Sequence, residues 1–181
     1  MLKYFCGHSN VHVNHHHLNK MNSIKIRLIK KADNPALATI IRGALKEFGA
    51  DRPCTVYYDE STDHLFELFQ QEKAVYHVAE IDGVVVGGAG IFPTDGLNTD
   101  TCELVKMYLS PPARGMGAGK LLMNHCFAAA KEKGFLKLYL ETMPELIVAI
   151  PMYEKFGFTY LKGPLGNSGH TGCAIWMLKD L

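Results

Sequence analysis

The spacing of apolar residues near the start of the chain predicts a strand followed by two helices. Apolar and polar residues alternate over 24–29, which is the two-residue period of a half-buried strand. Apolar residues then recur at helical spacing, with Asp33 placed to cap the helix, Pro35 in its first turn and Gly49 just beyond its end. A second, shorter helix is expected over 65–73, after a polar and aromatic loop.

The pattern then becomes strand-like, and three apolar runs predict an antiparallel meander. The runs cover 74–81, 84–92 and 101–109. The first two are joined by Asp82-Gly83, a dipeptide typical of a type I′ hairpin turn. Three glycines inside the second run indicate a bulge or a close approach by another backbone, namely Gly87, Gly88 and Gly90.

Helical spacing returns after the meander and predicts a crossover between two neighbouring strands. Residues 118–133 have one apolar face, and the run that follows, 136–142, is typical of a strand. A strand, a helix and a strand in this order form a right-handed crossover, which puts the two strands parallel or nearly adjacent in one sheet. Residues 158–165 and 171–181 then predict a closing hairpin, so the fold class is mixed α/β.

One more helix is expected between the crossover and the closing hairpin. Thr142 and Glu145 have the spacing of a capping box, so we place the start of the helix there and its end at residue 156. Pro151 lies inside this span and is expected to kink the helix, because proline has no backbone N–H group.

Length and composition favour a single globular domain. The chain has 181 residues, 48% of them hydrophobic and 20% charged, and no apolar run long enough to span a membrane. Its net charge of +1 gives no general electrostatic reason to expect nucleic acid or an anionic membrane as a partner, so any anion site must be local. The five cysteines form no C-x-x-C pair or zinc-finger pattern, so we expect free thiols, a reducing cytoplasm and no metal.

The first twenty residues are polar and irregular, and they lack the apolar core of a secretory signal. We expect a disordered His-rich extension over 1–20 and a functional domain over 21–181, because terminal segments are usually poorly ordered. A second interpretation is a zinc or nickel site. The histidines that allow it are His8, His12, His15, His16 and His17.

The glycine-rich stretch over 113–122, ARGMGAGKLL, is the clearest candidate for a phosphate-binding loop. The nucleotide P-loop requires a glycine where Arg114 stands, and Ser or Thr where Leu121 follows Lys120. The dinucleotide fingerprint requires its third glycine at the position of Lys120. Spacing therefore excludes both loops.

A third loop pattern, R/Q-x-x-G-x-G/A, fits at Arg114, Gly117 and Gly119. With a strand before it and a helix after it, this loop resembles the acetyl-CoA loop of the GNAT family of N-acetyltransferases. The sequence MYEKFGF over 152–158 resembles another motif of that family, and the order of elements over 22–181 is also similar. The resemblance implies a GNAT acyl-CoA N-acyltransferase fold, which has a mostly antiparallel central sheet, a splayed strand pair and flanking helices.

The resemblance and the chemistry of the loop together imply an acetyl-CoA site. Residues without Cβ let successive N–H groups turn inward, and the helix that follows adds unpaired N–H groups and the positive end of its dipole, which suits a pyrophosphate. In the family, the strand before the loop binds the pantetheine arm through its backbone. The implied cofactor residues are Met107, Tyr108, Leu109, Arg114, Gly115, Met116, Gly117, Ala118, Gly119, Lys120 and Tyr153. Leu146 stands where family members often carry Asn.

Acetyl transfer to an amine needs a neutral amine, a donor for the carbonyl oxygen and a proton for the departing thiolate. The resemblance puts Tyr153 at the position of the tyrosine that supplies this proton. A phenol with a pKa of about 10 is a suitable acid for a thiolate of similar pKa.

Two glutamates are candidates for the general base, because different branches of the family carry one at the position of Glu103 or of Glu141. Two-residue alternation puts Glu103 on the same face as Val105 and Met107, and neither glutamate can be assigned to a cleft from the sequence. We favour Glu103. His170 is a third candidate, because the pKa of histidine suits proton relay.

The family usually builds its acceptor pocket from the first two helices, their loop and the last hairpin. Here these segments bring Tyr57, Tyr58 and Asp59 near His170, and such an acidic and aromatic rim suits a small cationic amine. We therefore expect an enzyme that transfers the acetyl group of acetyl-CoA to a primary amine of a small molecule, or to a protein amino group, by direct attack in a ternary complex. The alternative is a non-catalytic acetyl-CoA sensor or interaction module. A homodimer is compatible with the sequence.

Overall fold

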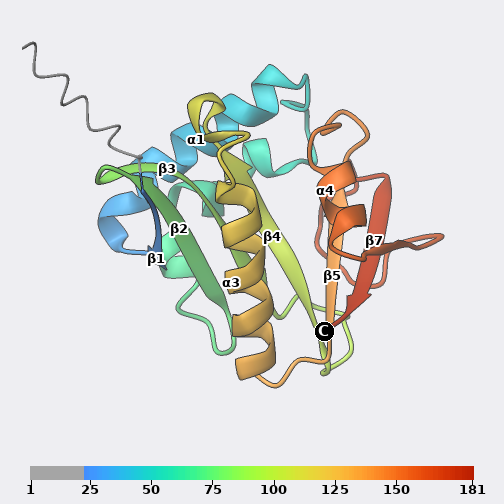
Figure 1. Ribbon diagram of the computed structural model, residues 1–181. Coiled ribbons are helices and arrows are strands. Elements are labelled where there is room, and N and C mark those ends of the chain that lie inside the picture. The colour runs from blue at the N-terminus through green and yellow to red at the C-terminus, as the bar shows by residue number, and fades with distance from the viewer. Residues whose placement is uncertain (1–22) are drawn as a thin grey trace, which may run out of the picture.

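The computed structural model describes residues 23–181, which form a seven-stranded sheet with helices on both faces (Figure 1). The strands lie in the order β1-β2-β3-β4-β5-β7-β6, and the sheet is mostly antiparallel, as expected. Their bounds are β1 Ile24–Leu28, β2 Val75–Ile81, β3 Val84–Phe92, β4 Thr101–Leu109, β5 Lys137–Thr142, β6 Thr159–Tyr160 and β7 Ile175–Asp180. The expected His-rich extension lies outside the described residues.

The helices cover the two faces of the sheet with separate hydrophobic clusters. Their bounds are α1 Asn34–Glu47, α2 Leu65–Leu68, α3 Ala118–Glu132 and α4 Ile150–Lys155. α1 and α2 pack on one face, while α3 and α4 pack on the other. None of the helices within residues 23–181 is long and apolar enough to cross a membrane.

α1 begins and ends close to the predicted positions. Gly49 has a φ of 68°, as a glycine just beyond a helix end commonly does. Asp33 stands at the start of α1, but its carboxylate accepts hydrogen bonds from the Lys30 amide and from Arg27 instead of capping the helix. Asp33 therefore occupies the predicted N-cap position, but its side chain does not cap the helix, because Arg27 and the turn before α1 bind that carboxylate.

The meander predicted from the sequence is confirmed. β1, β2, β3 and β4 pair in sequence order, each antiparallel to the next. Asp82 and Gly83, between β2 and β3, have φ angles of 51° and 81°, as a type I′ turn requires. A Cβ added to Gly88 would lie 2.4 Å from Cε1 of Tyr76. Both expectations for β3 are confirmed: the register with β4 shifts between Gly88 and Gly90, and the backbone carbonyl of Tyr108 comes within contact distance of where a Cβ of Gly87 would lie.

β4, α3 and β5 form the predicted crossover, with β4 and β5 parallel. Only three pairs join these strands: Thr101 with Lys137, Cys102 with Leu138 and Glu103 with Tyr139. β4 continues to Leu109 without further pairing to β5. The two strands therefore separate along the second half of β4, as Figure 1 shows.

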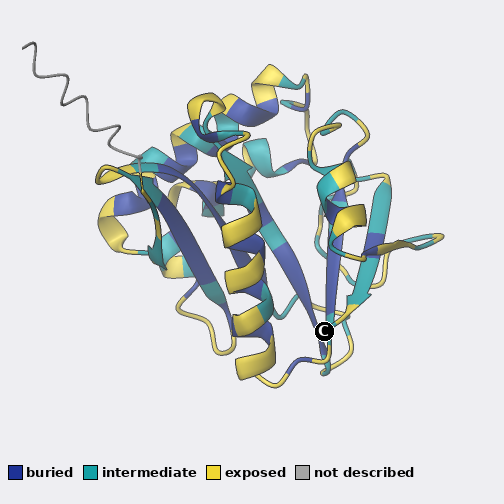
Figure 2. Ribbon diagram, viewed as in Figure 1, coloured by how far each residue is buried: buried dark blue, intermediate teal, exposed yellow. Residues whose placement is uncertain are grey.

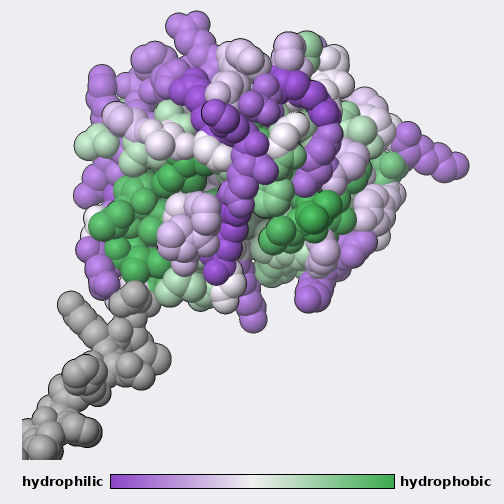
Figure 3. All heavy atoms as spheres, turned by 90° about the horizontal axis from the view of Figure 1, so that it is seen from above, coloured by the Kyte–Doolittle hydropathy of each residue, from purple (hydrophilic) through white to green (hydrophobic). Residues whose placement is uncertain are grey.

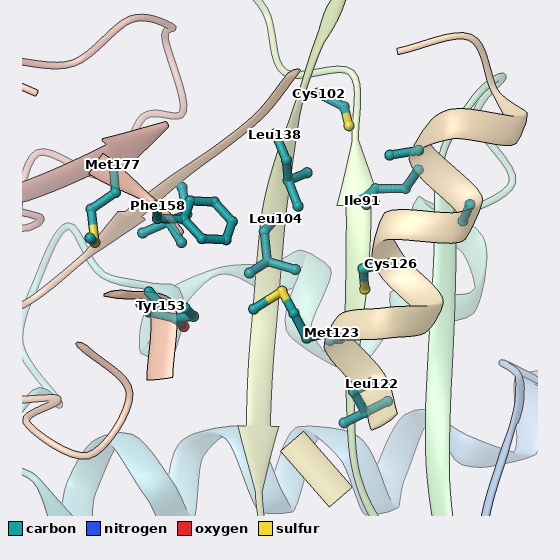
Figure 4. Packing of buried hydrophobic residues seen from close by; sticks show 14 of the residues in the cluster. Ile91, Cys102, Leu104, Leu122, Met123, Cys126, Leu138, Tyr153, Phe158 and Met177 are labelled. Carbon is teal, nitrogen blue, oxygen red and sulfur yellow. The ribbon is translucent and has the colours of Figure 1, made fainter. Parts of the chain in front are cut away.

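The larger hydrophobic cluster fixes β4 and β5 against α3. Leu104, Met123 and Leu138 come from these three elements and meet in the cluster (Figure 4). Each is at most 4% exposed, and burying one such side chain contributes about 1.5–3 kcal/mol. Figure 2 shows buried strands behind the exposed outer face of α3. This packing also fixes the start of α3, where the glycine-rich loop lies.

The helix before the closing hairpin is shorter than predicted. α4 begins at Ile150, and Thr142 belongs to β5, so the predicted capping box is wrong. Glu145 instead binds Arg52. Pro151 is the second residue of α4, where no helical hydrogen bond requires its N–H group, so the predicted kink is also wrong.

Candidate active site

Two cavities adjoin where β4 separates from β5, and each has a volume of about 390 Å³. The first cavity lies between the end of β4, the glycine-rich loop and α4. The second lies between β4, β5 and the segments 55–61 and 167–173. The residues that line both are Leu104, Lys106, Tyr108, Glu141, Thr142 and Leu146. Cavities of this size suit small ligands.

The glycine-rich loop carries a row of unpaired amide groups at the first cavity. Within residues 23–181, the N–H groups of residues 115–120 have no backbone acceptor, and the next amide, of Leu121, already bonds the Gly117 carbonyl at 3.1 Å. Gly115 and Gly117 have φ angles of 77° and 91°, which favour glycine. Unpaired amides beside a helix N-terminus form a binding site for anions.

Most of the expected cofactor residues line the first cavity. The exceptions are Met116 and Ala118, which contribute backbone to the loop but whose side chains lie elsewhere. Seen from above, hydrophobic residues gather in two patches with a hydrophilic strip between them (Figure 3). Val148 lines the first cavity and is 61% exposed. The rim of this cavity is therefore apolar on the side that precedes α4.

The two cations of the loop differ in their partners. Arg114 donates to both carboxylate oxygens of Glu47, at 2.7 and 2.8 Å, and its guanidinium lies 5.2 Å from the ring centre of Phe48. The hydrogen bonds from Arg114 lower the pKa of Glu47. Lys120 also lines the cavity, and it forms no ion pair within residues 23–181. Lys120 can therefore meet an anion directly, while Arg114 is held by α1.

A bulge in β4 decides which side chains face each cavity. Val105 pairs with Gly90 and Tyr108 with Gly88, so two residues of β4 lie opposite one residue of β3. Lys106, within the bulge, has a φ of 50°. The bulge turns Met107 to the opposite face, which corrects the expectation that Glu103, Val105 and Met107 share a face. Tyr108 takes that place instead.

Tyr153 lies on α4 at the first cavity, across from β4 (Figure 4). Its side chain packs edge-on against Phe158, with ring centres 5.9 Å apart. Burial raises the pKa of Tyr153 above its ordinary value. The phenol therefore keeps its proton at neutral pH, but it is a weaker acid than the phenol with a pKa of about 10 that was expected to match the thiolate.

Glu103 is a buried carboxyl group at the second cavity. It is 4% exposed, and the hydroxyl of Thr94 donates to Oε2. Burial, reinforced by the charge of Glu141, raises the pKa of Glu103 to about 7. A carboxylate with this pKa is matched to proton transfer at neutral pH.

Glu141 lies on the same face of the sheet as Glu103 and lines both cavities. The hydroxyl of Tyr139 donates to Oε1 and that of Ser168 donates to Oε2, each at 2.7 Å. The sequence left the choice between the two glutamates open, and the fold brings both to the second cavity.

Asp59 joins Lys106 and His170 at the wall of the second cavity. Its Oδ2 lies 3.0 Å from Nζ of Lys106 and 2.8 Å from Nε2 of His170. Burial alone would raise the pKa of Asp59, but the hydrogen bond with His170 and the charge of Lys106 outweigh it and lower the pKa to about 2. Lys106 was not predicted as a site residue. Its sequence signal is a lysine between apolar residues of a strand.

Tyr57 and Tyr58 line neither cavity, although both were expected at the acceptor site. Their rings pack on each other with centres 5.0 Å apart, and Tyr58 is 63% exposed. Of the three residues expected from that loop, the structure therefore brings only Asp59 together with His170. Within residues 23–181, no group of three or more His, Cys, Asp or Glu side chains is arranged to hold a metal ion.

Comparison with known sequences identifies related proteins. A model of the acetyltransferase (GNAT) family matches residues 42–158. The uncharacterized N-acetyltransferase YjgM of Escherichia coli K12 is 42% identical over 158 residues, which are 86% of this chain and 94% of YjgM. The IAA acetyltransferase of Azospirillum brasilense is 32% identical over 134 residues, which are 72% of this chain and 85% of that protein.

Solved structures share the fold. A GNAT-family acetyltransferase from Staphylococcus aureus Mu50 superposes with a TM-score of 0.74 at 18% identity, over 87% of this chain and 99% of that chain. The yncA structure from Salmonella typhimurium, solved with its cofactor acetyl-CoA, has a TM-score of 0.69 at 21% identity, over 87% of this chain and 94% of that chain. At these identities the likeness concerns the fold.

Proposed function

Because this chain belongs to the acetyltransferase (GNAT) family, we propose that its two cavities bind the two substrates of an acetyl-CoA-dependent N-acetyltransferase. The first cavity receives acetyl-CoA and the second receives the acceptor amine. The observation that carries this proposal is the opening between β4 and β5, where the same six residues line both cavities. Substrates held on either side of it can react directly in a ternary complex.

The residues of the first cavity fit acetyl-CoA. The unpaired amides of residues 115–120 and the ammonium of Lys120 suit the pyrophosphate. Within residues 23–181, β4 has no strand partner on the β5 side after Glu103, so backbone groups near Met107 and Tyr108 are available to the pantetheine arm. The Leu109 carbonyl already accepts a hydrogen bond from Nε of Arg114 at 3.1 Å. Acetyl-CoA supplies the acetyl group as an activated thioester.

Glu103 is the proposed general base. Its pKa of about 7 suits the task, and its Oε1 accepts no hydrogen bond from residues 23–181. Both oxygens of Glu141 already accept hydrogen bonds from hydroxyl groups. Glu141 therefore holds the substrate ammonium beside Glu103. Glu103 then takes a proton from this ammonium, which leaves a neutral amine.

The remaining steps use β4 and Tyr153. Backbone N–H groups of β4 stabilise the negative charge that develops on the acetyl oxygen. Tyr153 donates a proton to the departing sulfur as the carbon–sulfur bond breaks. The substrate nitrogen loses two protons in all, one before attack and one after it. The second of these protons restores the phenol of Tyr153, whose own proton is now on the thiol of coenzyme A, and the first leaves Glu103 for solvent.

Release of free thiol from acetyl-CoA in the presence of a panel of amines and peptides tests this function. We expect thiol release that depends on the amine, with formation of the acetylated amine seen by mass spectrometry. Thermal stabilisation by acetyl-CoA without turnover on any acceptor would instead identify a non-catalytic sensor.

We also propose a cytoplasmic location, since the four cysteines within residues 23–181 are unpaired, as is usual in reducing compartments.

A further inference from the structure

Carboxyl groups outnumber lysine and arginine side chains on the wall of the second cavity. Four carboxyl groups lie on its wall, from Asp59, Asp95, Glu103 and Glu141. Among the described residues, Lys106 is the one lysine or arginine that faces them there. The sign of this charge bears on which amine can enter.

Lys106 is already neutralised by the protein. Its Nζ lies 3.0 Å from Oδ2 of Asp59 and 3.4 Å from Oγ1 of Thr62, and its side chain is 6% exposed. Asp59 in turn binds His170. Within this network the positive charge of Lys106 is compensated by the negative charge of Asp59.

The other three carboxyl groups have no cationic partner within residues 23–181. The side-chain donors that Glu103 and Glu141 have within the described part of the chain are all hydroxyl groups. Glu103 is also buried, with Oε1 free of any protein donor among the described residues. Asp95 is exposed, and its side chain makes no hydrogen bond to any of the residues 23–181. A ligand can therefore supply the missing positive charge.

Part of the remaining wall of the second cavity is apolar, and hydroxyl-bearing residues and the polar segment 167–170 make up the rest. Its apolar lining includes Val56, Leu68, Phe92, Val105 and Met143. The segment 167–173 closes one side, because Asn167 N–H donates to the Asp95 carbonyl at 2.7 Å and Gly172 N–H to the Cys54 carbonyl at 3.2 Å. The space suits a compact molecule with an apolar body.

We propose that the acceptor is a small cationic amine with an apolar body and no carboxylate, so that free α-amino acids are rejected. This inference rests on the proposed function and adds the substrate class. An ammonium is attracted by Glu103, Glu141 and Asp95. A carboxylate on the same molecule would be desolvated among like charges, and no lysine or arginine of residues 23–181 lies free on this wall to receive it.

Matched pairs that differ only by a carboxylate test the proposal. The pairs are phenethylamine with phenylalanine and 3-methylbutylamine with leucine, and phenylalanine amide restores the bulk without the charge. Calorimetry with the coenzyme A complex gives Kd, and thiol release from acetyl-CoA gives kcat/KM. We expect each compound without a carboxylate to bind at least tenfold more tightly than the amino acid it is paired with. The proposal is overturned if no amine binds more tightly than its carboxylated partner.

Asp95→Lys supplies a second test, because Asp95 lies at the exposed edge of the cavity wall. This variant should reduce the preference for amine over amino acid by about five- to tenfold. Glu72→Lys makes the same charge change at an exposed site outside both cavities and should leave the preference unaltered. Equal effects of the two variants would contradict the proposal. Thiol release with amino acids as efficient as with amines would refute this inference alone, whereas acetyl-CoA binding without any thiol release would refute the proposed function.

Discussion

Glu103 of β4 and Tyr139 of β5 form the last pair before the two strands separate. The Tyr139 hydroxyl donates to Glu141, two residues farther along β5 and on the same face. Both glutamates therefore lie at the point where β4 and β5 begin to separate. The point of separation thus concentrates negative charge beside the opening that joins the two cavities.

Replacement of Glu103 by Gln should remove the general base while keeping the size of the side chain. We expect kcat/KM to fall by about 10²- to 10⁴-fold. The Kd for acetyl-CoA should stay within about twofold, because Glu103 does not line the first cavity. Steady-state kinetics and calorimetry measure the two quantities. Glu72→Gln, at an exposed site outside both cavities, is the matched control.

The same substitution should change how stability depends on pH. The pKa of Glu103 is raised from 4.5 to about 7, so between these values the folded protein holds a proton that the unfolded chain has lost. The free energy of unfolding therefore falls as pH rises through this window. Glu103→Gln should lack this fall and be more stable by about 1–3 kcal/mol at pH 8. Urea unfolding at pH 4.5 and pH 8 gives the free energy of unfolding of the wild type and of the variant. The same change between the two pH values in both proteins would refute the raised pKa of Glu103.

Tyr153→Phe should lower kcat by about 10- to 100-fold, because it removes a single proton donor. The KM for acetyl-CoA should change little, since the ring and its packing against Phe158 are kept. Pre-steady-state thiol release reports the affected step. Undiminished release would assign Tyr153 to packing alone.

Gly117→Ala should weaken acetyl-CoA binding. Gly117 has a φ of 91°, and its loop carries the unpaired amides. A Cβ at positive φ costs about 1 kcal/mol, and the relaxed loop would point its amides elsewhere. Gly49→Ala introduces a Cβ at a φ of 68°, outside both cavities. We expect both variants to lose similar thermal stability, but only Gly117→Ala to raise Kd, by about tenfold; a matching rise in Gly49→Ala would contradict this.

Glu47→Gln should release Arg114 and remove a carboxylate close to the first cavity. The pair is joined at 2.7 Å and is partly exposed, so its own contribution to stability is small. We expect Kd for acetyl-CoA to fall by about two- to fivefold at low salt, with a smaller change at high salt. Calorimetry at two salt concentrations measures it. An unchanged Kd at both would indicate that Arg114 does not meet the ligand.

Local patterns in the sequence predicted most of the fold. Alternation and the Asp82-Gly83 turn predicted the meander, and helical spacing after Lys120 predicted the crossover. The start of α4 differs from the prediction because Thr142 continues β5 and the helix begins at Ile150, just before Pro151. A proline in the first turn was the better signal.

The chemistry of the site depends on contacts that sequence spacing does not contain. The bulge at Lys106 arises from pairing with β3, so it changed the face of Met107 without a local signal. The position of Tyr57 follows from the turns after α1, which pack it against Tyr58. The raised pKa of Glu103 likewise requires burial by segments far apart in the chain.

The pH dependence of kcat/KM for the wild type and for Glu103→Gln, between pH 5.5 and 9 with one accepted amine, tests the central claim most directly. The wild-type rate should rise with pH and level off above an inflection near 7, the pKa of Glu103. The variant should lose most of the rate and also this inflection. An unchanged inflection in Glu103→Gln, at a rate close to that of the wild type, would contradict the assignment of Glu103 as the base between the two cavities.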